Sequence, residues 1–230
     1  MQSTNMSSHS VPKEREFAFT DKDFQFLAKI ANNLTGIVIS ASKKDMVYSR
    51  LVRRLRHLGL ESFAQYCTFI ERGEDPDEIM NLVNAITTNL THFFREPHHF
   101  EHLKKELKIA SEHSKKYRIW SAGCSSGMEP YTIAMSIRST IKNLNNWDIR
   151  ILATDIDTNM LEIGRKGEYN ISEYENIPKG YRSDLLKNEK KEIITMGDDL
   201  KQLIAFKQLN LLEHWPMKGS FDFIFCRNVV

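Results

Sequence analysis

Two stretches of the chain carry residues that could hold a nucleotide-like cofactor. The run from Ile119 to Tyr131, IWSAGCSSGMEPY, indicates a buried strand, a glycine turn and the start of a helix. Further along, the run from Ile149 to Asp157 indicates a second apolar strand that ends in carboxylates. In a doubly wound sheet, an acid at such a strand end accepts hydrogen bonds from a ribose. The pair therefore predicts a nucleotide site at one edge of a parallel sheet.

A third stretch, NLTHFFRE at residues 89–96, places two adjacent aromatic residues beside an arginine. Two interpretations stay open from the residues alone. The phenylalanines are core, with Arg95 paired to Glu96 or to solvent. Alternatively, the segment lies over the nucleotide site, where Asn89 and Thr91 donate hydrogen bonds and Arg95 faces an anion.

The run from Asp45 to Leu60 predicts an amphipathic helix with one strongly basic face. Few neighbouring acids in the sequence neutralise this face. It is either a solvated surface or a docking site for an acidic protein or a nucleic acid. The basic side chains that define it are Arg50, Arg53, Arg54 and Arg56.

Other reactive residues predict no further chemistry. His98 and His102 stand four apart on an expected helix, but the sequence offers no third ligand, so no metal site is predicted. Cys124 is interpreted as a small residue beside the cofactor rather than a nucleophile. The chain has 3 cysteines, widely spaced, which argues against a disulfide framework and against a zinc cluster. A reducing cytoplasm fits this usage best.

Composition limits the class of protein. With 230 residues, of which 41% are hydrophobic and 27% charged, the chain can form one large or two modest globular domains. The formal net charge of +2 does not require a nucleic-acid partner. No apolar run is long enough to span a membrane, and no heptad seam is present, so a monomer without membrane insertion is expected.

The elements that must position these residues fall into two regions of different texture. Residues 17–86 have apolar residues at helical spacing, and Thr20 with Asp23 predicts the N-cap of a first helix that Gly36 ends. From Lys116 onward, strands and helices alternate, which predicts a parallel sheet. A connecting helix is expected over residues 96–113, and residues 1–16 are expected to be a disordered leader.

Taken together, these motifs resemble the CheR-type chemotaxis receptor glutamate methyltransferases. The segments that carry the resemblance, in matching order and spacing, are residues 89–96, 122–134, 153–157, 210–212 and 221–230, with the basic helix before them. The resemblance implies a helical, receptor-facing domain at 17–86 and a Rossmann-like, S-adenosylmethionine-binding domain at 87–230. It also implies an inserted antiparallel β subdomain at about 167–206, which can dock on receptor tails.

The resemblance also implies a set of site residues. Asp155 would hold the ribose hydroxyls, and Arg95 would serve the methyl-transfer site near the methionine end. The four arginines of the basic face would contact the receptor. The remaining residues expected around S-adenosylmethionine, or its product S-adenosylhomocysteine, are Asn89, Thr91, Gly123, Gly127, Glu129, Asn210, Leu211, Arg227 and Asn228. Asp157 is expected to cap the following helix instead.

The sequence departs from the family pattern in two places. Met128 occupies a position that is usually acidic or amide-bearing, and it is interpreted as a packing residue. The strand at residues 221–230 ends the chain, whereas the family continues with further strands and helices, so a truncated sheet is expected. Three functions stay open: receptor methyltransferase, methyltransferase on another substrate such as RNA, and catalytically weak receptor-binding adaptor. A nicotinamide-binding fold is a weaker option, because Gly123 and Gly127 do not form the usual dinucleotide pattern.

Overall fold

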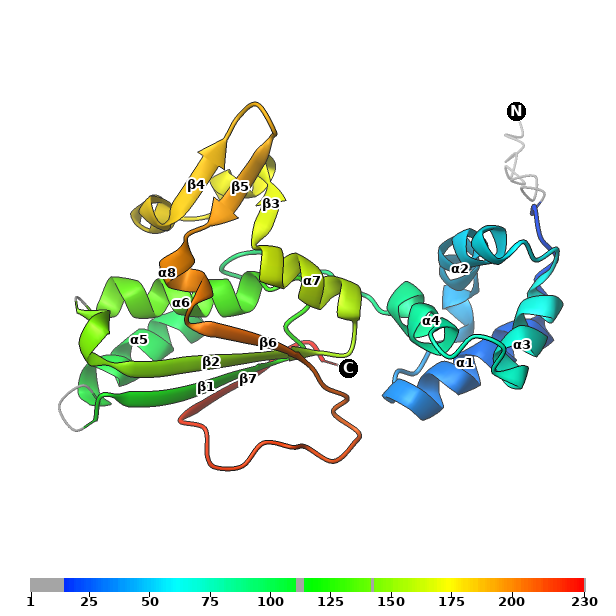
Figure 1. Cartoon of the computed structure of the whole chain (residues 1–230), viewed down its shortest axis with the longest axis horizontal. Helices are drawn as coiled ribbons and strands as arrows, with labels where there is room; N and C mark the ends of the chain where they lie inside the picture. The colour runs from blue at the N-terminus through cyan, green and yellow to red at the C-terminus, as the bar shows by residue number, and fades with distance from the viewer. Residues whose placement is uncertain (1–14, 111–113, 142, 230) are drawn as a thin grey trace, which may run out of the picture.

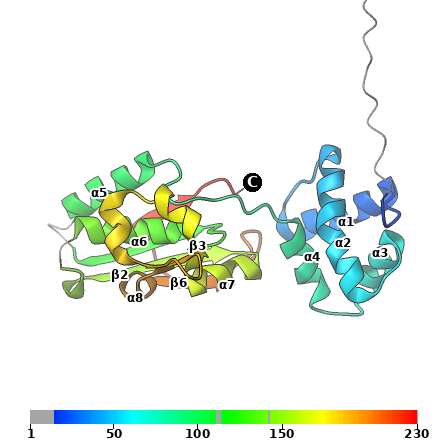
Figure 2. The same cartoon turned by 90° about the horizontal axis from the view of Figure 1, so that it is seen from above.

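A computed structural model of the chain describes residues 15–110, 114–141 and 143–229. Within these residues a helical N-terminal unit stands beside an α/β unit, and one extended linker joins them (Figures 1 and 2). The leader expected at 1–16 lies almost entirely outside the described residues.

The N-terminal unit is built from helices, as the sequence predicts. Thr20 caps the first helix with the expected capping box, and Gly36 ends it with a φ of 76°. Ser62 caps a later helix by accepting from the backbone amide of Gln65. The helices are α1 (Asp21–Thr35), α2 (Lys44–Leu58), preceded by a 3-10 turn (Ala41–Lys43), α3 (Phe63–Arg72) and α4 (Glu78–Ile86). Their apolar faces meet in one core, in which Leu51, Leu55 and Phe63 are fully buried.

The α/β unit is organised around a parallel sheet. Its strands are β1 (Lys116–Ala122), β2 (Asp148–Asp155), β6 (Ile204–Gln208) and β7 (Phe223–Cys226), in the order β6-β2-β1-β7. Ala122 pairs with both Thr154 and Cys226, and Asp155 pairs with Gln208. The carboxyl ends of all four strands therefore meet at one edge, which confirms the predicted Rossmann-like sheet.

Helices and a loop cover the two faces of this sheet. On one face, α5 (His98–Ala110), α6 (Met128–Thr140) and α7 (Thr158–Lys166) contribute to the main core (Figure 1). Met128 packs against this core, as expected from the sequence. On the other face, Trp120 packs against Trp215 and Phe221 of the loop between β6 and β7.

A second sheet confirms the inserted antiparallel subdomain and corrects its end. Its strands are β3 (Glu168–Asn170), β4 (Leu185–Asn188) and β5 (Ile193–Met196), in the order β3-β5-β4. The segment at 203–206 is expected from the sequence to belong to it, but its residues from Ile204 onward lie in β6 of the main sheet. After β5, the short helix α8 (Asp198–Lys201) returns the chain to β2, where Phe206 is buried in the main core.

Close packing at Gly164 leads to a stability prediction. A Cβ atom on Gly164 of α7 would lie 2.6 Å from Cε1 of Phe206 in β6. Gly164→Ala should lower the free energy of unfolding by about 1–3 kcal/mol, because this overpacking exceeds the gain in helix propensity. Gly180→Ala is the control, since a Cβ atom there would meet no atom of the described residues within 4 Å beyond its own chain neighbours. Urea unfolding of both variants measures the difference, and equal stabilities would contradict the packing argument.

Candidate functional site

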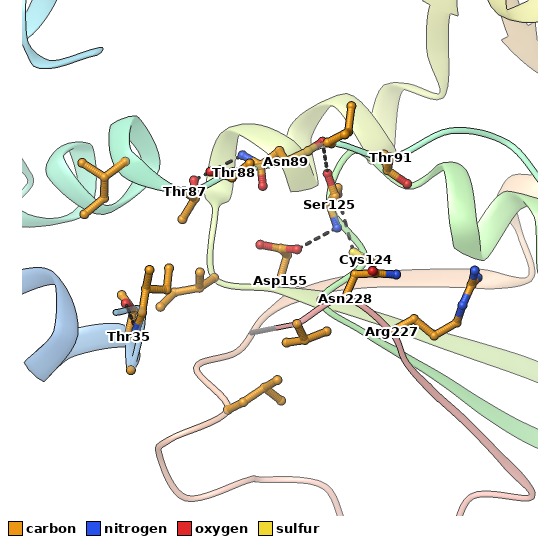
Figure 3. A pocket seen from close by; sticks show the side chains of 18 of the residues that line it. Thr35, Thr87, Thr88, Asn89, Thr91, Cys124, Ser125, Asp155, Arg227 and Asn228 are labelled. Carbon is orange, nitrogen blue, oxygen red and sulfur yellow. Dashed lines mark hydrogen bonds between the residues drawn. The ribbon is translucent and has the colours of Figure 1, made fainter. Parts of the chain in front are cut away.

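A cavity of about 680 Å³ opens where the carboxyl edge of the parallel sheet faces the N-terminal unit. Its walls include residues 35–39 at the end of α1, the start of α2, the linker at residues 86–92, and the turns after β1, β2, β6 and β7. Figure 3 shows Thr35 on one side, the linker residues Thr87 to Thr91 above, and Asp155 and Asn228 facing the space between them.

The cavity brings together most of the residues expected to bind a cofactor. Those that line it are Asn89, Thr91, Arg95, Gly123, Glu129, Asp155, Asn210, Leu211, Arg227 and Asn228. Gly127 is not among the residues that line the cavity, and its expected contact with the cofactor stays a prediction. It begins α6 with a φ of 88°, and a Cβ atom there would lie 2.9 Å from Cα of Gly164. Gly127 therefore permits the turn and the close packing of α7.

Asp155 lies at the end of β2, and backbone amides hold its carboxylate. Oδ2 accepts from the amide of Ser125 at 2.7 Å, and Oδ1 accepts from the amide of Asp157 at 2.9 Å. Each carboxylate oxygen has a second lone pair, so the group can still accept from two vicinal hydroxyls. Burial raises the pKa of Asp155, and the amide hydrogen bonds oppose that rise.

The turn after β1 adopts a backbone conformation that non-glycine residues rarely use. Ser125 has a φ of 49°, and its hydroxyl donates to the carbonyl of Asn89 at 3.1 Å. Asn228, across the cavity, has a φ of 56°. Left-handed backbone at such residues stores strain that the surrounding structure must hold in place. The turn is therefore fixed to both Asp155 and the linker.

Glu129 and Arg227 form a buried ion pair at the far end of the cavity. Oε1 of Glu129 accepts from the hydroxyl of Ser121 at 2.7 Å, and Oε2 accepts from Nη1 of Arg227 at 2.9 Å. Burial raises the pKa of Glu129, although Ser121 and Arg227 both act to lower it. Nη2 of Arg227 also donates to the carbonyl of Arg95 at 2.5 Å and to Glu96 at 3.0 Å. Nε of Arg227 is buried without a hydrogen-bond partner in the described structure, so a donor remains for a ligand.

Arg95 is half-buried at the mouth of the cavity. Its Nη1 donates to the carbonyl of Leu90 at 2.9 Å, and its Nη2 donates to Oδ1 of Asn228 at 3.1 Å. A guanidinium has five N–H groups, so these two bonds orient the group and leave donors for an anion. The expected role of Arg95 toward an anion therefore fits its position.

Two asparagines of the expected set turn their side-chain amides into the protein. Nδ2 of Asn89 donates to Oδ2 of Asp157 at 2.7 Å, and Nδ2 of Asn210 donates to the carbonyl of Leu34 at 2.6 Å. Both residues line the cavity, but these bonds fasten its walls. Asp157 also caps α7 by accepting from the amides of Asn159 and Met160, as the sequence predicts.

The aromatic pair after the linker belongs to the core. Phe93 is 2% exposed and packs edge-on against Tyr169, while Phe94 packs against Tyr181 of the inserted subdomain. Cys124 lines the cavity, and burial raises the pKa of its thiol well above the ordinary range, which makes it a poor nucleophile.

The described residues hold no group of three histidine, cysteine or acidic side chains placed to bind a metal ion. Among the helices that the structure describes, none is long and apolar enough to cross a membrane.

The basic face of α2 is largely paired, which corrects the expectation that few acids neutralise it. Arg54 forms a bidentate pair with the fully buried Glu78, and Arg56 pairs with Glu16 at the surface. Nη1 of Arg50 donates to the carbonyls of Ile86 and Thr87 at 2.8 and 2.6 Å. These partners come from distant segments, so the local sequence did not reveal them. Arg53 and Arg56 are the exposed members of the set, and Arg56 is paired with Glu16.

Sequence reasoning missed part of the site. It did not place residues 35–39 in the cavity, nor did it identify Ser121 and Ser125 as the partners of Glu129 and Asp155. The available sequence signal was the position of Ser125 inside the glycine turn. No local signal marks residues 35–39, because only the packing of the two units brings them to the sheet edge.

Comparison with known proteins assigns both units to one family. A family model described as "CheR methyltransferase, SAM binding domain" matches residues 89–230. A second, described as "CheR methyltransferase, all-alpha domain", matches residues 22–87.

Curated relatives agree over most of the chain. "Chemotaxis protein methyltransferase 2" of Pseudomonas aeruginosa is 42% identical over 224 residues, covering 94% of this chain and 78% of the relative. "Probable chemotaxis protein methyltransferase" of Rhizobium etli is 40% identical over 202 residues, covering 85% of this chain and 75% of the relative. "Chemotaxis protein methyltransferase" of Escherichia coli is 38% identical over 218 residues, covering 93% and 74%.

The ion pairs that Arg54 and Arg56 of α2 form should respond differently to mutation. Glu78→Ala should lower the local free energy of unfolding by about 3 kcal/mol or more, because it removes the acceptor of both Arg54 and Tyr66 inside the protein. Glu16→Ala removes the exposed partner of Arg56 and should leave stability near that of the wild type. Hydrogen exchange of the α2 and α3 amides measures both changes. Similar protection in the two variants would contradict a structural role for the buried pair.

Proposed function

The chain belongs to the CheR methyltransferase family, and on that premise we propose that it transfers the methyl group of S-adenosylmethionine to glutamate carboxylates of chemotaxis receptors. The observation that carries this proposal is the cavity itself. Asp155, a hydroxyl-binding carboxylate, and Arg95, an anion-binding guanidinium, lie in one space at the carboxyl edge of the sheet.

The residues of the cavity fit S-adenosylmethionine. The carboxylate of Asp155 retains acceptor capacity for the ribose hydroxyls, and Gly123 lets the backbone come close to a ligand. The ion pair of Glu129 and Arg227, with the free Nε of Arg227, offers both charges to the amino-acid end of the cofactor. When bound, this cofactor supplies an electrophilic methyl group on a positively charged sulfur.

The chain needs to contribute alignment rather than acid or base chemistry. A glutamate side chain has an ordinary pKa of about 4.3, so the acceptor is already an anion at neutral pH. Arg95 would orient that carboxylate, and its bonds to Leu90 and Asn228 fix the guanidinium plane for this role. Alignment of two reactants corresponds to effective concentrations of about 10⁵ M or more in well-oriented systems.

The proposed partner is the cytoplasmic part of a methyl-accepting receptor, so the enzyme would act in the cytoplasm. We propose that it acts as a monomer. Arg53 on α2 would offer an exposed arginine to an acidic receptor surface. The partners of Arg50, Arg54 and Arg56 argue against a broad nucleic-acid face on this helix, because these cations already have acceptors. An RNA substrate is correspondingly less well supported than a receptor.

Asp155→Ala tests the cofactor site directly. We expect the dissociation constant for S-adenosylhomocysteine, measured by calorimetry, to rise about ten- to a hundredfold, because a charge-assisted hydrogen bond to the ribose is lost.

Methyl transfer is followed with radiolabelled S-adenosylmethionine and receptor cytoplasmic fragments, as base-labile methanol release. Receptor fragments with the acceptor glutamates changed to alanine are the substrate control. Binding without base-labile transfer would indicate an adaptor, and transfer unaffected by the acceptor changes would indicate a different substrate.

The pH dependence of binding follows from the raised pKa values of two carboxyls. Burial raises the pKa of both Asp155 and Glu129 above the ordinary values of these side chains. Protonation removes the charge that strengthens their hydrogen bonds, so affinity for S-adenosylhomocysteine should fall as pH decreases. The fall should begin at a higher pH than ordinary carboxyls would give. Calorimetry across the acidic pH range measures this fall in affinity. Asp155→Asn is the control, because it removes the contribution of Asp155 to the pH dependence. An affinity that does not change down to pH 4 would contradict the prediction.

A further inference from the structure

The linker between the two units is bound at its middle by one buried carboxylate. Asp157 follows β2 and is 1% exposed. Its Oδ1 caps α7 by accepting from the amides of Asn159 and Met160. Its Oδ2 accepts from the hydroxyl of Thr87 and from Nδ2 of Asn89, both at 2.7 Å. One oxygen therefore serves the helix, and the other serves the linker.

The bonds of Asp157 close a ring around the proposed ribose site. The amide of Asp157 donates to Oδ1 of Asp155, and Oδ2 of Asp155 accepts from the amide of Ser125. The hydroxyl of Ser125 donates to the carbonyl of Asn89, and the side chain of Asn89 returns to Asp157. Figure 3 shows the part of this ring that runs from Asn89 through Ser125 to Asp155. Every member except Asp157 lines the cavity.

Helix capping alone does not account for these contacts. An N-cap needs one acceptor oxygen, which a serine also supplies. The second oxygen of Asp157 instead accepts two hydrogen bonds from residues that lie 68 and 70 positions earlier in the chain. A neighbouring pair strengthens the same junction, since Nδ2 of Asn84 donates to the hydroxyl of Thr158 at 2.9 Å.

We propose that Asp157 is a positioning residue for methyl transfer: its Oδ2 fixes the linker across the cavity and so holds Asp155 and Ser125 in their binding geometry. The inference rests on the proposed cofactor site and assigns Asp157 no contact with the cofactor. When Oδ2 is removed, Thr87 and Asn89 lose their shared acceptor. The backbone carbonyl of Asn89, which accepts from the hydroxyl of Ser125, is then no longer held in place.

Two variants separate positioning from capping. Asp157→Ser keeps an acceptor for α7 but is too short to reach the linker. Thr87→Val removes one linker donor with little change of shape and leaves the α7 cap intact. Ser62→Ala is the matched control, because it deletes the N-cap of α3, which lies outside the cavity lining.

The first readout is hydrogen exchange of the linker amides at residues 86–91 in the protein without ligand. We expect faster exchange in Asp157→Ser and Thr87→Val, and wild-type exchange in Ser62→Ala. The second readout is the dissociation constant for S-adenosylhomocysteine, which should rise roughly tenfold in Asp157→Ser and less in Thr87→Val. In the double variant, the dissociation constant should rise by less than the product of the two single increases, because both changes break the same hydrogen bond.

Two results would overturn the inference. Linker exchange and affinity in Asp157→Ser that match the wild type would show that Asp157 only caps α7. Equal loss of affinity in Asp157→Ser and Ser62→Ala would show a general effect of lower stability. Failure of the wild type itself to bind S-adenosylhomocysteine would instead overturn the proposed function, and this inference with it.

Discussion

The end of β2 imposes the constraint on which the rest of the site depends. Two carboxylates, Asp155 and Asp157, are buried there, and their hydrogen-bond partners among the described residues include no cation. A buried charge is tolerated only when hydrogen bonds replace its water, so each oxygen has to find donors. The donors come from the turn after β1, from the start of α7 and from the linker. Satisfying these two charges therefore brings three separate segments to one edge of the sheet.

The linker is held from the other side as well. Arg50 of α2 donates to the carbonyls of Ile86 and Thr87, immediately before the side chains that reach Asp157. One short segment thus joins the basic helix of the N-terminal unit to the carboxylates of the sheet. The hydrogen bonds of Arg50 and those of Asp157 therefore hold the same segment from opposite sides. The division of the chain into two units does not divide its function.

The sequence predicted the secondary-structure elements better than the contact partners of individual side chains. The glycine turn, the acid at the end of β2 and the N-cap of α7 are local patterns, and each lies where its pattern indicates. Residues 35–39 and the acceptors of Arg50 and Arg54 depend on contacts between distant segments, so no local pattern marks them. The assignment of residues 203–206 to the inserted subdomain was wrong for a related reason. A short apolar strand has the same pattern in either sheet, and only the return path through α8 places it in the main sheet.

The cavity takes walls from both units, and this has a thermodynamic consequence for the free protein. A ligand that contacts residues 35–39 and the sheet edge together binds only when both units are folded and docked. Its binding free energy therefore stabilises the junction as well as each unit. In the protein without ligand, the linker contacts and the hydrogen bond from Asn210 to the carbonyl of Leu34 hold this junction. A cofactor bound across the junction would therefore couple the unfolding of the two units more tightly and raise the resistance of this protein to proteolysis.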